Sequence, residues 1–167
     1  SLLEDGNAEI RAQAAKTLGD VGGPESASAS VRYTSLLGDT SERVRMYAGV
    51  ALGKLGVPAS VGPLLAALDR NNNADLVLRS GLVYALTLLG ERDEHVAEQI
   101  VRQSSGLNAG GKLGAVLTLR RLNHDGVAGF LGDADATVRV AAADGVLRAV
   151  RAEFVPGQYR FRVASRD

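Results

Sequence analysis

The sequence has no cysteine and no tryptophan, and only 4% of its 167 residues are aromatic. Without cysteine there is no disulfide framework, no thiolate metal site and no cysteine nucleophile. Lys and Arg number 19, as do Asp and Glu. The chain as a whole therefore lacks the positive field that draws proteins to nucleic-acid phosphates. No apolar run approaches the roughly 18 residues of a membrane-spanning helix. These absences argue against nucleic acid and membrane as partners.

Motifs for catalysis or cofactor binding are also missing. His95 lies beside Glu94 and His124 beside Asp125, but neither has a second ligand at helical spacing. Surface histidines are the simpler interpretation. The glycine-rich stretch at 106–111 lacks the lysine of a phosphate-binding loop, and we interpret it as a connection between helices. The sequence predicts no catalytic residue, no metal and no cofactor.

A repeated segment is the main feature that is present. The stretch EIRAQAAKTLGDVG (9–22) returns as ERVRMYAGVALGKLG (42–56), with Arg11 and Arg45 separated by 34 residues. Further copies follow at Arg79, Lys112 and Arg139, after 34, 33 and 27 residues. A period of this length is typical of solenoids, in which each unit buries its apolar face only against its neighbours.

Within each copy, apolar residues recur at positions −1, +3, +7 and +10 from the arginine or lysine. This spacing predicts one face of an amphipathic helix that points into a core. The predicted core positions are Ile10, Ala14, Leu18 and Val21; Val44, Ala48, Leu52 and Leu55; Leu78, Leu82, Leu86 and Leu89; Gly111, Ala115, Leu119 and Leu122; and Val138, Ala142, Val146 and Ala149.

The ends of these helices also carry signals. Glycine at position +11 is expected to end the helix in a left-handed conformation. It occurs as Gly22, Gly56 and Gly90. Aspartate six residues before the arginine offers oxygens to free N–H groups near the helix start. These residues are Asp5, Asp39 and Asp133, and Glu42 is expected to complete a capping box in the second copy.

Shorter helical segments at 27–37, 61–68 and 94–103, with a stub at 127–131, lie between the copies. We therefore predict an all-α fold, an α-solenoid of about five stacked helical hairpins over residues 1–150. The first repeat is incomplete, because residues 1–3 resemble only the end of a hairpin's first helix. We predict residues 151–167 to be a separate tail, whose Pro156-Gly157 turn and alternating apolar residues suggest a short hairpin, a cover for the last repeat or a disordered segment.

The order Leu37-Gly38-Asp39, Val44-Arg45, Ala48, Leu52-Gly53 and Leu55-Gly56 resembles the HEAT repeat, in the short bacterial form also called the PBS-lyase type. The resemblance extends over about residues 1–150. It implies that the arginine and the loop aspartate pair along the stack. The implied structural ladder comprises Arg11, Arg45, Arg79, Arg139, Asp5, Asp39 and Asp133. The fourth copy departs from this pattern, with Lys112 in place of the arginine and Gly110-Gly111 before it.

Residues 112–135 are also similar to the helical-repeat segment of large exported bacterial proteins, in which a sugar-dehydrogenase-like propeller and a cytochrome c module flank the helices. The chain has no Cys-x-x-Cys-His haem motif. This resemblance implies a spacer or docking element and not a catalytic module.

Positions +2, +5 and +9 lie opposite the core stripe and are expected to form the inner face of the array. They include Gly114 and Ala141, but the centre of this face is apolar and carries two tyrosines. The predicted partner-binding residues are Tyr47, Val50, Tyr84, Leu88, Leu117, Arg121 and Arg148. Two alternatives stay open, namely that a loop covers the tyrosines, and that a basic patch of Arg120, Arg121, Arg148 and Arg151 binds an acidic partner.

The leading hypothesis is a non-catalytic scaffold that binds another protein, or positions neighbouring domains of a longer chain, through this inner face. The alternative is a lyase-type or DNA-modifying enzyme on the same helices. Because a solenoid end leaves apolar surface in water unless it is capped, the incomplete first repeat also suggests a fragment of a longer protein or end-to-end self-association.

Overall fold

The computed structural model describes residues 1–21 and 26–153, which form helices joined by short turns. In chain order the elements are η1 (Leu2–Glu4), α1 (Ala8–Val21), α2 (Ser26–Leu36), α3 (Glu42–Leu55), η2 (Pro58–Ser60), α4 (Val61–Asn71), α5 (Leu76–Arg92), α6 (His95–Gln103), η3 (Ser104–Gly106), α7 (Ala109–Arg121), η4 (Asp125–Phe130) and α8 (Ala136–Glu153). No strand occurs in this part of the chain, so the all-α prediction is confirmed.

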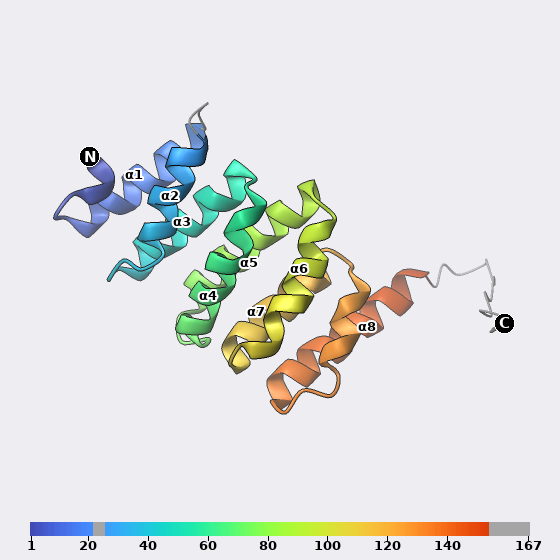
Figure 1. Ribbon diagram of the computed structural model, residues 1–167. Coiled ribbons are helices and arrows are strands. Elements are labelled where there is room, and N and C mark those ends of the chain that lie inside the picture. The colour runs from blue at the N-terminus through green and yellow to red at the C-terminus, as the bar shows by residue number, and fades with distance from the viewer. Residues whose placement is uncertain (22–25, 154–167) are drawn as a thin grey trace.

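The elements pair as five helical units laid side by side (Figure 1). The long helices α1, α3, α5, α7 and α8 contact one another in that order and form one layer. Each is preceded by a shorter helical element that packs against it, namely η1, α2, α4, α6 and η4. The arrangement is an α-solenoid of stacked hairpins, as the repeat predicts. Helix α8 continues three residues past the expected boundary at 150, and the predicted tail hairpin lies outside the described residues.

Helix ends follow local sequence, with two differences from expectation. Gly56 takes the left-handed conformation, φ 72°, and ends α3 as predicted. Gly90 does not end α5, which continues to Arg92, and Gly22 lies outside the described residues. The capping box is also wrong, because Glu42 bonds to Arg45 while the hydroxyl of Ser41 accepts the N–H of Val44.

The core is built from the predicted stripe in the middle of the array. Val44, Leu52, Leu82 and Leu86 are fully buried. Burial of such side chains contributes about 1.5–3 kcal/mol each to folding. Every aliphatic residue of the second and third stripes is at least partly buried, which the 3.6-residue period requires if units stack on both sides.

The first unit departs from the predicted core. Leu18 is 50% exposed and Val21 77%, although the register predicts both as core positions. In the second unit the matching residue Leu52 is buried, because α2 packs against α3. The element that precedes α1 is only the three-residue turn Leu2–Glu4, of which Leu3 alone is buried. The side of α1 that faces away from α3 is therefore left open.

Small residues set the distance between the first three long helices. A methyl group added at Gly19 would lie 2.7 Å from Cβ of Ala51, and one added at Gly53 would lie 2.6 Å from Cα of Ala85. Both glycines occupy position +8 and both alanines position +6 of the next copy. The same contact thus recurs from unit to unit.

The fourth unit uses its glycines differently. A Cβ at Gly110 would lie 2.4 Å from backbone atoms of Asn72, and one at Gly114 would lie 2.7 Å from Leu68, both near the end of α4. These glycines let the start of α7 lie directly on α4. The sequence departure at Gly110-Gly111 is therefore a packing feature, and Gly111 is buried against Asp69 instead of leading an aliphatic stripe.

Candidate protein interface

The inner face predicted from sequence is the solvent side of the long helices. Tyr84 on α5 is 44% exposed, and Tyr47 on α3 is half-buried. No loop of the described chain covers either ring completely. Of the other predicted residues, Val50, Leu88 and Leu117 are half-buried, and Arg121 and Arg148 are exposed.

Two residues assigned to this face from sequence are placed elsewhere. Gly114 is buried against Leu68 of α4, and Ala141 is buried among the packed helices. For Gly114 the cause is the close contact of α7 with α4, whereas Ala141 lies on α8, which packs against α7 and η4. The centre of the face therefore lies on α3 and α5, and Leu117 continues it onto α7.

Tyr47 and Val50 line a cavity of about 190 Å³ between α1 and α3. Lys16, Asp20 and Lys54 complete the polar part of its lining. The guanidinium of Arg43 lies 5.8 Å from the centroid of the Tyr47 ring, within the range of a cation–π contact. The tyrosine thus lies in a recess with a charged rim.

An ion pair joins the two helices at this recess. Lys54 Nζ donates to the Asp20 carboxylate, and this hydrogen bond is the main cause that lowers the pKa of Asp20. Asp20 therefore stays ionised at neutral pH, and with two lysines against one carboxylate the rim carries a net positive charge. An acidic side chain of a partner would meet favourable charge here.

One carboxylate lies among the described arginines of the proposed basic patch near the C-terminal end. Arg120 and Arg148 both pair with the carboxylate of Asp144, with Arg148 Nε at 3.0 Å. Arg121 is exposed, and the side chain of Arg151 lies outside the described residues. One carboxylate against Arg120, Arg121 and Arg148 leaves a net positive charge, so an acidic partner at this patch stays a prediction.

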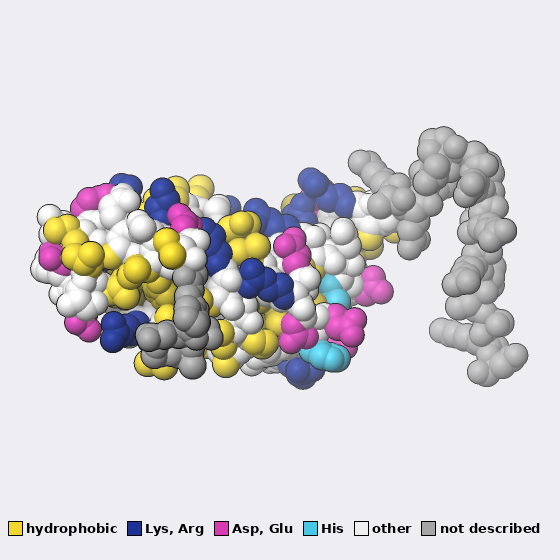
Figure 2. All heavy atoms as spheres, turned by 90° about the horizontal axis from the view of Figure 1, so that it is seen from above, with side chains coloured by type: hydrophobic (Ala, Val, Ile, Leu, Met, Phe, Trp, Pro, Cys, Tyr) yellow, Lys and Arg dark blue, Asp and Glu magenta, His cyan; other side chains and the backbone are white. Residues whose placement is uncertain are grey.

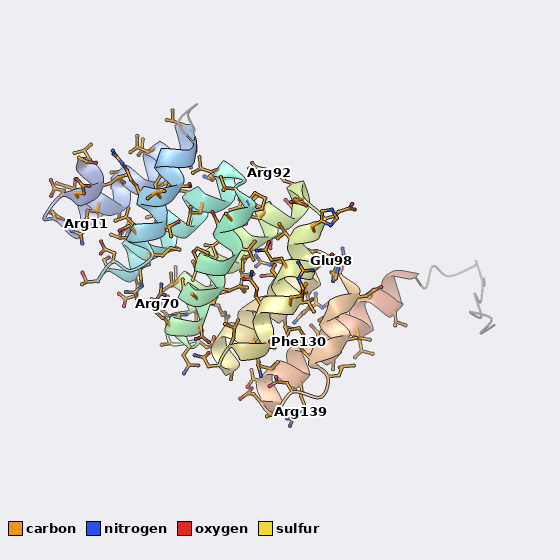
Figure 3. All side chains as sticks on the ribbon, in the orientation of Figure 1. Arg11, Arg70, Arg92, Glu98, Phe130 and Arg139 are labelled. Atoms are coloured by element: carbon orange, nitrogen blue, oxygen red, sulfur yellow. The ribbon has the colours of Figure 1, made fainter. Side chains whose placement is uncertain are left out.

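The predicted ladder residues link the units at one edge of the array, where Arg11, Arg70 and Arg139 lie (Figure 3). Arg11 of the first unit donates from Nε and Nη2 to both carboxylate oxygens of Asp39 in the second, at 2.8 and 2.9 Å. The two side chains are largely buried. The guanidinium lowers the pKa of Asp39 through these bonds, assisted by the N–H of Ser41.

The ladder is interrupted in the middle of the array. Position −6 of the third copy is Asn73, which accepts a bond from Arg79 of its own unit, and that of the fourth is Gly106. Arg45 consequently bonds within its own unit, to the carbonyl of Asp39 and to Glu42. An ion pair between units forms again where position −6 of the next copy is an aspartate.

In the last two units, Lys112 Nζ lies 2.8 Å from the carboxylate of Asp133, and this bond lowers the pKa of that group. Lysine thus fulfils the role of the ladder arginine in the fourth copy. Within the part of the chain that the structure describes, Arg139 bonds only to carbonyls of its own loop.

Other polar links between units were not predicted from the sequence. Asp69 accepts the N–H of Asn108 at 2.6 Å, where the ladder lacks an acid. At the opposite edge, Arg92 donates to the carbonyl of Lys54 at 2.6 Å and so satisfies the end of α3 (Figure 3). Each of these residues joins segments 38 or 39 positions apart, and no local pattern marks that pairing.

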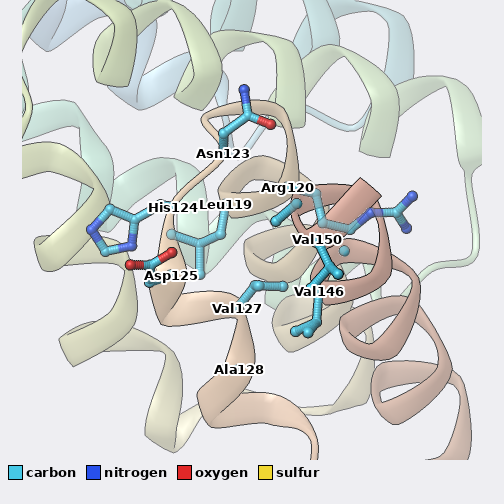
Figure 4. Close-up of a pocket in the computed structure, with 11 residues that line it drawn as sticks. Leu119, Arg120, Asn123, His124, Asp125, Val127, Ala128, Val146 and Val150 are labelled. Carbon is cyan, nitrogen blue, oxygen red and sulfur yellow. The ribbon is translucent and has the colours of Figure 1, made fainter. Parts of the chain in front are cut away.

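A second cavity, of about 270 Å³, lies between α7, η4 and α8 (Figure 4). Its lining is mainly aliphatic and includes Val127 and Val146, with Arg120 at one side. His124, also at the lining, accepts the N–H of Gly126 at 3.1 Å and thereby holds the turn. His95 is exposed and lies 4.0 Å from Glu98.

Among residues 1–21 and 26–153, no three His, Cys, Asp or Glu side chains come together as metal ligands. No helix in the same part of the chain has the length and apolar character needed to span a membrane.

Helical pairs stacked in one direction, with long helices in one layer and shorter elements in the other, define the class of α-solenoid repeat proteins. Residues 1–87 match the family model described as HEAT repeats, and the chain belongs to this family. Proteins of this family are typically non-enzymatic scaffolds that mediate protein–protein interaction. A search of curated proteins finds no match.

Proposed function

We propose that this protein is a non-catalytic scaffold that binds another protein, or a neighbouring domain of a longer chain, through the inner face. One observation carries the proposal. Tyr84 is exposed and Tyr47 half-buried on successive long helices, with Val50 and Leu88 between charged ends of the same face. Tyrosines and aliphatic residues surrounded by charged groups are typical of the energetic centre of protein interfaces.

The recess at Tyr47 supports a partner with an acidic group beside an apolar segment. Its rim has one more lysine than acid, and the Arg43 contact holds the ring in place. Such a rim speeds encounter and sets orientation, while the apolar centre supplies most of the affinity.

The test uses a photoreactive amino acid at position 88, beside the tyrosines, to capture partners in cells that express the protein. The same experiment is repeated in a Tyr47→Ser/Tyr84→Ser background. Loss of the contacts that the two tyrosines would make with the partner should reduce captured partner at least tenfold. Arg102→Ser on α6, which is exposed away from this face, is the matched control and should leave capture unchanged.

Unchanged capture by the double variant, with helical content intact by circular dichroism, would exclude this face as the binding site. The rival function is a lyase-type or DNA-modifying enzyme on the same helices. It would require titratable groups that converge in a cleft. Nothing in the geometry of the two cavities favours it over the scaffold.

We also propose that the ends of the array take part in association. Leu18 and Val21 on α1, and Val140 and Leu147 on α8, are half or more exposed at opposite ends. Large apolar side chains at a solenoid end favour a covering partner, because burying them removes apolar area from water.

A further inference from the structure

Among the described residues, the ion pair that links one unit to the next has one half without a partner at each end of the array. Within the stack, the complete link consists of two parts. Arg11 Nη1 donates to the carbonyl of Asp5 in its own loop at 2.7 Å, and Nε and Nη2 reach Asp39 in the next unit. The bond to the carbonyl orients the guanidinium, and the bonds to the carboxylate connect the two units.

Arg139 in the last unit makes the bonds that orient the guanidinium but not the bonds to a carboxylate. Its Nη1 donates to the carbonyls of Asp133 and Ala134 at 2.7 and 2.8 Å, the same two loop positions that hold Arg11. In the described chain no carboxylate pairs with Arg139. By correspondence with Arg11, its Nε–H and Nη2–H groups are the donors left to bind a carboxylate of a following unit.

Asp5 in the first unit corresponds to Asp39, the carboxylate that accepts the arginine of a preceding unit. One oxygen accepts the N–H of Asn7 at 2.7 Å, as Asp39 accepts the N–H of Ser41 at 2.9 Å. In Asp39 the arginine of the preceding unit then binds both oxygens. Among the described residues no arginine or lysine forms an ion pair with Asp5. The loop holds this carboxylate in the orientation that a preceding unit would require.

Apolar side chains accompany these two groups on each end face. Ile10, Leu18 and Val21 are exposed on α1, and Val140, Leu147 and Val150 are exposed on α8. Figure 2 shows hydrophobic side chains gathered over the first helices of the array. Each end thus has an apolar face with one half of the ion pair at its edge.

We infer that the occupant of each end face is a second copy of this chain, stacked head to tail, with Arg139 of one copy bound to Asp5 of the next. This deepens the end-to-end contact proposed above and does not depend on the inner face. The charges favour this occupant, since residues 1–101 have nine Lys and Arg against thirteen Asp and Glu, and residues 102–167 ten against six. A head-to-tail contact is heterologous and continues into open-ended oligomers.

The experiment is sedimentation velocity of the full chain over a wide range of concentration, with two end-blocking variants. Leu18→Glu blocks the first face and Leu147→Glu the last, and both side chains are half-exposed, at 50% and 56%, so the fold is retained. The unmodified chain should form dimers and larger species as concentration rises. Each variant alone should stay monomeric, and an equimolar mixture should form a dimer that does not grow.

Charge variants provide a second, independent arm. Asp5→Lys and Arg139→Glu should each weaken association by about three- to tenfold, and mixing them should restore it, because every joint between two unlike chains then pairs opposite charges, native in one direction and swapped in the other. Arg102→Glu, on the exposed surface of α6, is the control and should leave association unchanged.

A strictly monomeric chain at the highest concentration would overturn the inference. So would dimers of Leu147→Glu alone, which would show a contact between two first faces, and so would a mixture of blocked variants that stays monomeric. The Tyr47→Ser/Tyr84→Ser variant should associate as the unmodified chain does. Failure of the end contact is thus distinguishable from failure of the inner-face proposal.

Discussion

Replacing Gly53 by alanine should destabilise the array, although alanine is the better helix former. The added methyl group would lie 2.6 Å from Cα and 2.7 Å from the carbonyl oxygen of Ala85 on α5. Both are backbone atoms, so no change of rotamer relieves the contact. Ordinary carbon contacts need at least 3.5 Å, and α3 and α5 must therefore separate by about 1 Å at this point.

The expected change combines two opposing effects. Alanine in place of glycine within a helix stabilises by about 1 kcal/mol, whereas overpacking costs about 1–3 kcal/mol. Because the obstacle is a neighbouring backbone whose shift disturbs further core contacts, we expect the upper part of that range. The net loss is about 1–2 kcal/mol, which corresponds to a decrease in Tm of about 3–6 °C.

Urea and thermal unfolding followed by circular dichroism measure this change. Gly129→Ala is the control, since it lies in the helical turn η4 and its methyl group would meet no atom within 4 Å. The control should be neutral or stabilised by up to about 1 kcal/mol. If Gly53→Ala proved as stable as Gly129→Ala, the close contact would not determine the spacing of the long helices.

Two further predictions concern the core and the ladder. Leu82→Ala removes a fully buried side chain at the centre of the stack and should lower the free energy of unfolding by about 2–5 kcal/mol, measured in urea; a loss below about 1 kcal/mol would contradict its central role. Asp39→Asn should cost about 1.5 kcal/mol at neutral pH through the weaker bond to Arg11. Because the pKa of Asp39 is lowered in the folded protein, this contribution is present above the unfolded carboxyl pKa of about 3.9 and is lost as pH falls through the folded value. The stability difference between parent and variant should therefore be constant from neutral to mildly acidic pH and shrink in stronger acid, and a difference that is constant down to the acid transition would refute the pair.

The amino-acid sequence alone determined the repeat and hence the architecture. The recurrence of Arg11 at Arg45 and Arg79, with apolar residues at helical spacing, predicts helices that need neighbours on both sides. It also placed the two tyrosines on the solvent side of the long helices, because their position within the period is set by the same register. Local patterns of this kind can be read without knowledge of distant contacts.

Tertiary structure decided which pattern positions are used, and how. Leu18 and Leu52 occupy the same register, yet only Leu52 is buried, because only α3 has a full helix packed on that side. Gly110 departs from the repeat pattern, and only the structure shows the reason, which is that the backbone of Asn72 leaves no room for a Cβ at this position. Periodicity states which side of a helix is apolar, but what lies against that side depends on residues 30 to 40 positions away, which no local signal specifies.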